Sequence, residues 1–233
     1  YNRNTQEEIG IRNALGLLYY NRKSYQEAIY QFSRLKELLP DDPQIPYQTA
    51  LIQFDQGKYP EALQEVNGIT QKFPENFFYQ TLRLKILEKL DRGAEGYQGF
   101  LHGLGSAMEK NSWDDTESFL VELTRKVRIQ RLQEYKQLST MQQLLEKSIQ
   151  KFPDHPRTLF IAAKVALVRN QPNEANQFLE KILSELDKNR AMKNGEGLDD
   201  LLFEFRNWYE VRRALSSSPF SEKTLSVLHN CQT

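Results

Sequence analysis

The stretch Tyr25-Gln26-Glu27-Ala28 recurs 34 residues later as Tyr59-Pro60-Glu61-Ala62. The stretch Leu38-Leu39-Pro40-Asp41 is followed at the same offset by Lys72-Phe73-Pro74-Glu75. A fixed period of this length is typical of chains that repeat one small supersecondary unit and pack each copy against the next. The sequence therefore predicts a stack of such units rather than one globular core.

The composition of the chain argues against several classes of protein. Among its 233 residues, 39% are hydrophobic and 11% aromatic, which is enough apolar surface to form a core. The 31 basic and 31 acidic residues cancel, whereas proteins that bind nucleic acids or membrane surfaces are usually basic. The longest apolar run, near residues 160–168, contains Lys164 and is shorter than the roughly 18 residues that a membrane span needs. We expect neither a membrane span nor general nucleic-acid binding.

The start of the chain and its single cysteine bear on processing and compartment. The chain begins with Tyr1 rather than methionine, and residues 1–5 lack the character of a signal peptide, so we expect a trimmed or processed piece. Cys231 has no second cysteine with which to form a disulfide. A reducing cytoplasm and a cysteine-poor periplasmic domain both fit, and the sequence leaves the compartment open.

Apolar residues at helical spacing predict two helices in the first unit. The first helix carries Ala14, Leu15, Leu18 and Tyr19, and the second carries Ala28, Ile29, Phe32 and Leu35. A polar turn over residues 21–24 separates them.

Six residues of this unit match the spacing of the tetratricopeptide repeat, which the chain resembles: Leu15, Gly16, Tyr19, Ala28, Phe32 and Pro40. Gly16 and Ala28 are small because two helices cross there, and Tyr19 and Phe32 fill the space beside the crossing. Pro40 cannot continue a helix and forces the exit to the next unit. The resemblance implies an all-α solenoid of antiparallel helix pairs with a right-handed superhelix.

We expect one array over residues 1–233, divided into repeats at 9–42, 43–76, 77–110, 111–155 and 156–189, with capping helices over 190–233. The second repeat keeps Ala50, Ala62 and Pro74, and the fifth keeps Ala163 and Ala175. About five repeats and two terminal helices therefore account for the length of the chain.

The second helix of the third repeat contains five glycines within residues 93–105. Glycine weakens a helix by about 1 kcal/mol relative to alanine. Either this helix is mobile, or it packs very closely against a neighbour. We favour close packing because Tyr97, Phe100, Leu101 and Leu104 lie on one helical face.

The period is interrupted in the fourth repeat. Pro153 lies 79 residues after Pro74, which is two periods and 11 residues. Because 11 residues form about three helical turns, we expect one extended helix over 114–134 and a second over 140–150. The polar, glycine-containing stretch 188–197 predicts a loop before the capping helices.

No combination of residues predicts catalysis or metal binding. The three histidines, His102, His155 and His229, are not paired at helical spacing, and no His-Glu-x-x-His motif is present. The glycine-rich stretch 99–105 lacks the Lys-Ser/Thr pair of a phosphate-binding loop. We therefore expect a protein that is not an enzyme and has no cofactor and no metal.

In tetratricopeptide arrays the inner face of the superhelix is lined mainly by the first helix of each repeat. The resemblance assigns ten residues to that groove: Asn13, Leu17, Tyr20, Tyr47, Gln48, Leu51, Phe54, Phe78, Thr81 and Lys85. The lysines of the carboxylate-clamp subset of the family are mostly missing, which argues against binding of a chain-terminal carboxylate. Aromatic and amide side chains suit a peptide segment with apolar anchors. Alternatively, the same aromatics pack between repeats.

A basic patch on the extended helix contains Arg125, Arg128 and Arg131. It could bind an anionic partner. The alternative is a solvated face in which cations pair with neighbouring acids, as Glu122 could pair with Lys126.

From the resemblance we expect a non-catalytic protein–protein interaction module, a scaffold or adaptor that binds a protein or peptide partner in its groove. Two alternatives stay open. The chain could be a regulatory or substrate-recruiting domain of a larger enzyme, or it could bind nucleic acid through the basic helix, against which its neutral net charge argues. Exposed repeat faces also permit homo-oligomerisation.

Overall fold

The computed structural model of the 233-residue chain describes residues 3–123, 126–151, 156–169 and 171–191. The chain divides into two compact units, Tyr1–Asp115 and Thr116–Thr233, each of which is described by itself. That all repeats form a single array with capping helices stays a prediction, because residues 192–233 lie outside the described part.

The described residues form helices and no strand. In the first unit the helices are α1 (Arg3–Asn21), α2 (Tyr25–Leu38), α3 (Gln44–Asp55), α4 (Tyr59–Lys72), α5 (Phe77–Lys89) and α6 (Gly93–Glu109). Helix α7 (Trp113–Leu123) begins at the end of this unit. The second unit continues with α8 (Lys126–Glu134), α9 (Leu138–Lys151), α10 (Pro156–Val168) and α11 (Pro172–Ala191).

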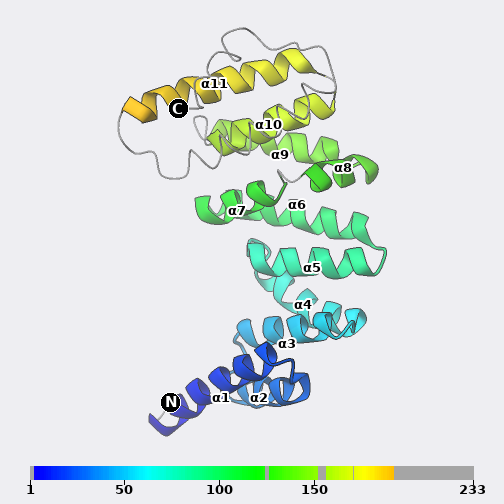
Figure 1. The fold of residues 1–233 in the computed structure, drawn as a ribbon, viewed down its shortest axis with the longest axis vertical. Coiled ribbons are helices and arrows are strands. Elements are labelled where there is room, and N and C mark those ends of the chain that lie inside the picture. The colour runs from blue at the N-terminus through cyan, green and yellow to red at the C-terminus, as the bar shows by residue number, and fades with distance from the viewer. Residues whose placement is uncertain (1–2, 124–125, 152–155, 170, 192–233) are drawn as a thin grey trace. The chain divides into compact units, whose positions relative to one another are not determined.

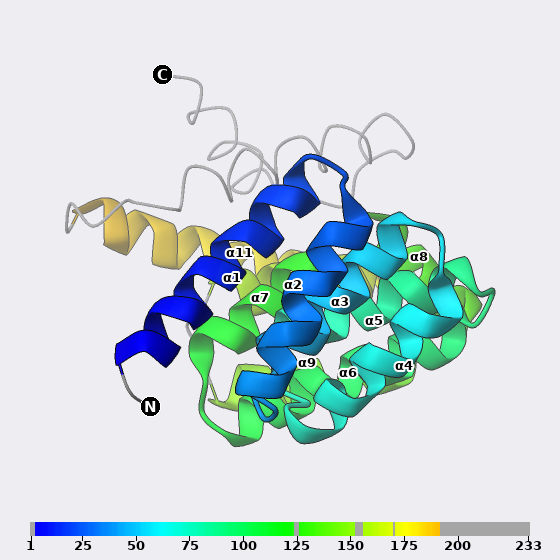
Figure 2. The same ribbon diagram turned by 90° about the horizontal axis from the view of Figure 1, so that it is seen from below.

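Consecutive helices of the first unit pack against one another, and short turns make each pair antiparallel (Figure 1). The pairs are α1 with α2, α3 with α4, and α5 with α6, and Figure 2 shows α1 and α2 side by side. Helix α2 also contacts α3, and α4 contacts α5, so each pair packs on the next. The stack of repeated units predicted from the period, and the all-α helix-pair architecture that the resemblance implies, are therefore confirmed for the first unit.

The turn inside each pair has the same backbone geometry in all three repeats. Lys23, Gly57 and Asp91, which are 34 residues apart, have positive φ angles of 60°, 75° and 56°. In each turn the N–H group of the following residue donates to the carbonyl five residues before it, at 2.9, 2.8 and 2.8 Å. This pattern is a Schellman motif, which satisfies carbonyls at the end of the first helix and reverses the chain.

Small residues allow the helices of a pair to approach closely, as the spacing predicts. A Cβ atom added to Gly16 in α1 would lie 2.8 Å from Cζ of Phe32 in α2, closer than real contacts allow. In the third pair, a Cβ added to Gly96 would lie 2.8 Å from Cδ1 of Leu84. Gly96 itself is buried. Close packing of the glycine-rich helix α6 against α5 is therefore confirmed.

In the second unit, α10 and α11 form the fifth repeat. Its two small residues, Ala163 and Ala175, are buried, as are Leu179 and Ile182 at the packing positions. Helix α11 continues to Ala191, so the loop predicted over 188–197 is wrong for residues 188–191. The reason is local: the first glycine after Pro172 is Gly195, so nothing in residues 188–191 ends the helix.

The irregular fourth repeat is helical where the structure describes it. Helices α7 and α8 cover 113–123 and 126–134, and α9 contains the predicted second helix over 140–150. Continuity of the predicted extended helix through residues 124–125 lies outside the described residues.

Candidate functional site

The ten predicted groove residues come from α1, α3 and α5, all in the first unit, and we call the surface that they define the groove face. Four of them are exposed: Asn13, Leu17, Phe78 and Lys85. Six are half-buried: Tyr20, Tyr47, Gln48, Leu51, Phe54 and Thr81. The apolar members of the predicted set therefore differ in how much surface they offer to a partner.

The aromatic residues of α3 belong partly to the core. Tyr47 and Phe54 pack against a buried cluster formed by α3, α4 and α5. The ring centroid of Tyr47 lies 5.2 Å from that of Tyr79, and that of Phe54 lies 5.5 Å from that of Tyr59. Burial also raises the pKa of Tyr47. These side chains contribute to packing between repeats, the alternative role that the sequence left open.

Tyr20 connects the first two repeats. Its hydroxyl donates a hydrogen bond to Oδ2 of Asp55 at 2.7 Å, which joins α1 to the end of α3. Burial and the hydrogen bond to the Asp55 carboxylate raise the pKa of Tyr20 to about 12, because both disfavour a phenolate. The phenol is thus engaged in a structural contact, while its ring contacts the apolar cluster of the first two repeats.

Phe78 is the most exposed aromatic of the predicted groove residues. Its side chain lies at the start of α5 and is 64% exposed, although its ring is 5.6 Å from that of Phe77. Leu17 in α1 is 37% exposed. Large apolar side chains at this level of exposure are available for contact with a partner.

The predicted basic patch is only partly described. Arg125 and the side chain of Arg128 lie outside the described residues. Arg131 is exposed and its Nη1 donates to Oε2 of Glu134 at 2.8 Å. This pair, three residues apart on α8, has the geometry of a solvated helix face.

The first unit contains a hollow, lined mostly by polar residues, that the sequence interpretation missed. It lies between α4, α5 and α6, has a volume of about 480 Å³, and is lined by residues that include Asn67, Gln71, Arg83, Glu95, Gln98 and His102. We call it the α4–α6 hollow. A signal for it exists in the sequence, because Arg83 occupies the position that apolar Leu15 occupies two periods earlier.

No group of three histidine, cysteine, aspartate or glutamate residues within the described ranges is placed to hold a metal ion. Among the same residues, no helix combines the length and the apolar character that crossing a membrane requires.

Comparison with known proteins identifies the fold. No protein-family model matches the chain, and no curated protein matches it. Among solved structures, that of the MamA protein is 12% identical with a TM-score of 0.50, covering 81% of this chain and 97% of its own. PilF of Pseudomonas aeruginosa is 14% identical with a TM-score of 0.50, covering 98% of this chain and 90% of its own.

A tetratricopeptide-repeat protein of Thermus thermophilus is 17% identical and covers 86% of this chain and 96% of its own. Its TM-score is 0.39. The two structures at 0.50 are tetratricopeptide-repeat proteins, and at these identities their likeness concerns the fold alone. Over its described residues the chain therefore has the tetratricopeptide-repeat fold, an all-α arrangement of consecutive antiparallel helix pairs.

Proposed function

We propose that the protein is a non-catalytic interaction scaffold or adaptor that binds a segment of a protein partner on the groove face. The observation that carries the proposal is the exposure of apolar side chains at predicted groove positions, 64% for Phe78 and 37% for Leu17. Exposed apolar side chains on a rigid helical surface supply the anchors of a typical peptide-binding groove.

Neighbouring aromatic residues support the exposed side chains of the groove face. Tyr47 on α3 packs against Tyr79 on α5, and Tyr20 on α1 donates a hydrogen bond to Asp55 at the end of α3, so the helices that present Phe78 and Leu17 are fixed relative to α3. A rigid surface lowers the entropy that is lost when a partner binds. Phe78 is thus expected to act as an anchor, and Tyr47 mainly as its structural support.

The experiment that tests the proposal is site-specific photo-crosslinking in cells that express the protein. Benzoylphenylalanine at position 78 or 85 should give the same crosslinked partner, because Phe78 and Lys85 lie on one face of α5. A probe at Gln26, which is exposed on α2, is the matched control and should not give that adduct.

Leu17→Ala should weaken the adduct formed from position 78, because Leu17 belongs to the same groove face. Circular dichroism should show unchanged helicity in this variant, because the Leu17 side chain is partly in solvent. The proposal is wrong if the probe at Gln26 captures the same partner equally well, or if positions 78 and 85 yield no common adduct.

A further inference from the structure

The α4–α6 hollow lies on a different side of α5 from the groove face. At 100° per residue, Gln80 and Arg83 point away from the helix on the side opposite to Phe78, Thr81 and Lys85. A ligand in the hollow would therefore leave the groove face accessible. The volume of about 480 Å³ is within the range of sites that hold small ligands or short peptide segments.

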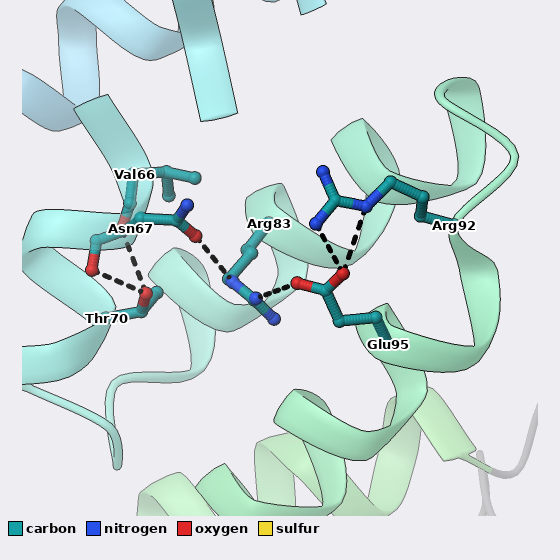
Figure 3. Close-up of polar contacts among 6 residues, drawn as sticks. All are labelled: Val66, Asn67, Thr70, Arg83, Arg92 and Glu95. Atoms are coloured by element: carbon teal, nitrogen blue, oxygen red, sulfur yellow. Dashed lines mark hydrogen bonds and ion pairs between the residues drawn. The ribbon is translucent and has the colours of Figure 1, made fainter. Parts of the chain in front are cut away.

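Arg83 is held in a fixed orientation in this hollow (Figure 3). Its Nε donates to Oδ1 of Asn67 on α4 at 2.8 Å, and its Nη2 donates to Oε1 of Glu95 on α6 at 2.7 Å. The side chain is only 16% exposed. Its third nitrogen, Nη1, lies beside Gly99, where an added Cβ would come within 2.6 Å of it. Within the described residues, Nη1 makes no hydrogen bond.

The charges around Glu95 do not balance. Oε2 of Glu95 accepts hydrogen bonds from Nε and Nη2 of Arg92 at 3.0 and 2.6 Å, while Oε1 is bonded to Arg83 (Figure 3). One carboxylate thus serves two guanidinium groups, and the three side chains together carry one net positive charge. Both carboxylate oxygens are already used, whereas a donor on Arg83 is available. The cluster is therefore suited to bind an additional hydrogen-bond acceptor that carries a negative charge.

The first and second repeats have a side-chain oxygen at the position that Gly99 occupies in the third. Glu65 and Gln31 occupy the same position one and two periods earlier in the chain, and each lines a hollow of its own. Oε1 of Gln31 accepts a hydrogen bond from Nη1 of Arg12 at 3.2 Å, and Oε2 of Glu65 lies 3.6 Å from Nζ of Lys36. In both earlier repeats, a side-chain oxygen from this position meets a cation. In the third repeat, glycine removes that oxygen, and Nη1 of Arg83 lies close against Gly99 instead.

We propose that the α4–α6 hollow binds the carboxylate of an acidic side chain in a peptide segment. The ligand carboxylate supplies an oxygen to the cation, as Gln31 and Glu65 do in the earlier repeats, and accepts a hydrogen bond from Nη1 of Arg83. The exposed amides of Gln71 and Gln98 line the same hollow and offer donors and acceptors to the peptide backbone. This site is separate from the groove face and does not depend on the function proposed for it.

The test uses the full chain and a fluorescein-labelled decapeptide of alternating glycine and glutamate, with affinity measured by fluorescence anisotropy at low salt. The matched peptide carries glutamine in place of glutamate. We expect the glutamate peptide to bind and the glutamine peptide to bind at least about tenfold more weakly, as expected for loss of a charge-assisted hydrogen bond.

Gly99→Glu restores the side chain that Glu65 provides in the second repeat, and should weaken binding of the glutamate peptide by about tenfold or more. Gly68→Glu controls for the added charge alone: it lies on α4, where an added Cβ meets nothing within 4 Å, and should leave the affinity nearly unchanged. Gly99→Ala controls for the displacement of Arg83, because its Cβ comes equally close to Nη1, and it should weaken binding less than Gly99→Glu. Arg83→Gln should abolish binding. If Arg83→Gln loses helicity, the comparison of Gly99→Glu with Gly68→Glu still tests the proposal.

Equal binding of the two peptides, or equal affinity of the wild type and Gly99→Glu, would overturn the proposal. Free glutarate that binds as tightly as the peptide would show a site for small acids instead. Phe78→Ala should not change binding of the glutamate peptide, and a loss of binding in that variant would place the peptide on the groove face.

Discussion

At the scale of single residues, two helical glycines, Gly16 and Gly68, lie in opposite surroundings, one tightly packed and one open. Gly16 lies against the ring of Phe32, where an added Cβ would come within 2.8 to 3.1 Å of three ring atoms. Gly68 lies in the middle of α4 and has no atom within 4 Å of an added Cβ. Because Phe32 is fully buried, its ring has little freedom to move away from Gly16.

Gly16→Ala should therefore lower the free energy of unfolding by about 1–3 kcal/mol, the usual cost of overpacking a core. Gly68→Ala should raise it by about 0.5–1 kcal/mol, because alanine favours the helix and meets no obstacle. Urea denaturation of both variants measures the difference. A change of the same sign in both would contradict the packing described for Gly16.

Because of the Tyr20 hydroxyl, the stability of the protein should depend on pH in the alkaline range. In the unfolded chain the phenol loses its proton near pH 10, whereas in the folded protein its pKa is about 12. Between these values only the unfolded chain releases the proton, so deprotonation favours unfolding. The contribution of Tyr20 to stability is complete below about pH 10 and should be lost as the pH rises towards about 12.

Tyr20→Phe should reduce this loss, and should also lower stability at neutral pH by about 1 kcal/mol because the hydrogen bond to Asp55 is removed. Urea denaturation at several pH values between neutrality and pH 12 measures both effects. Burial also raises the pKa values of Tyr47 and Tyr79, which remain in the variant, so part of the pH dependence should persist. An identical pH dependence in wild type and variant would exclude Tyr20 as a source.

At the scale of elements, the turn inside each helix pair depends on one left-handed residue. Lys23, Gly57 and Asp91 occupy this position in successive repeats, and only Gly57 adopts the conformation without a steric penalty. Gly57→Ala should therefore destabilise the protein by about 1 kcal/mol. Lys23→Gly and Asp91→Gly should each stabilise it by up to about 1 kcal/mol.

Thermal denaturation of the three variants measures these changes. Their opposite directions are the internal control, since all three substitutions alter the same position of the repeat. A stabilising effect of Gly57→Ala would contradict the Schellman geometry of the turns.

At the scale of the whole molecule, successive repeats are joined by side-chain bonds between residues 35 apart, one more than the period. The hydroxyl of Tyr20 donates to Asp55, Nε2 of Gln44 donates to the hydroxyl of Tyr79 at 3.1 Å, and Lys110 pairs with Glu75. Burial by itself raises the pKa of Glu75, but the hydrogen bond from Lys110, a hydrogen bond from the backbone of Glu75 and the charge of Lys110 together outweigh burial and lower that pKa. The offset of 35 residues therefore recurs between the first and second repeats, between the second and third repeats, and at the end of the third repeat.

Because these bonds connect neighbouring repeats, a fragment of residues 1–115 should fold by itself. We expect a helical circular-dichroism spectrum and a single cooperative transition in urea. A fragment without helicity, prepared beside the full chain under the same conditions, would show that the first unit needs the rest of the protein.

Local features of the sequence determined the helices, the turns and the crossings between helices. The spacing around Gly16, Ala28 and Phe32 predicted a helix crossing, and the structure shows Gly16 against the Phe32 ring. Such features depend on helical periodicity and on residue size, both of which act over a few turns of chain. The same local argument failed for residues 188–191, where polar residues were interpreted as a loop although none of them ends a helix.

Which side chains are available to a partner was decided only by the tertiary structure. Tyr47 and Phe78 are both aromatic groove positions in the sequence, but Tyr79 from the next repeat covers Tyr47, whereas Phe78 remains exposed. The α4–α6 hollow likewise arises because Arg83, Glu95 and Gly99 come together from two helices. The period of one helix predicts the face on which a residue lies, but its exposure and its partners depend on neighbours that are packed from other parts of the chain.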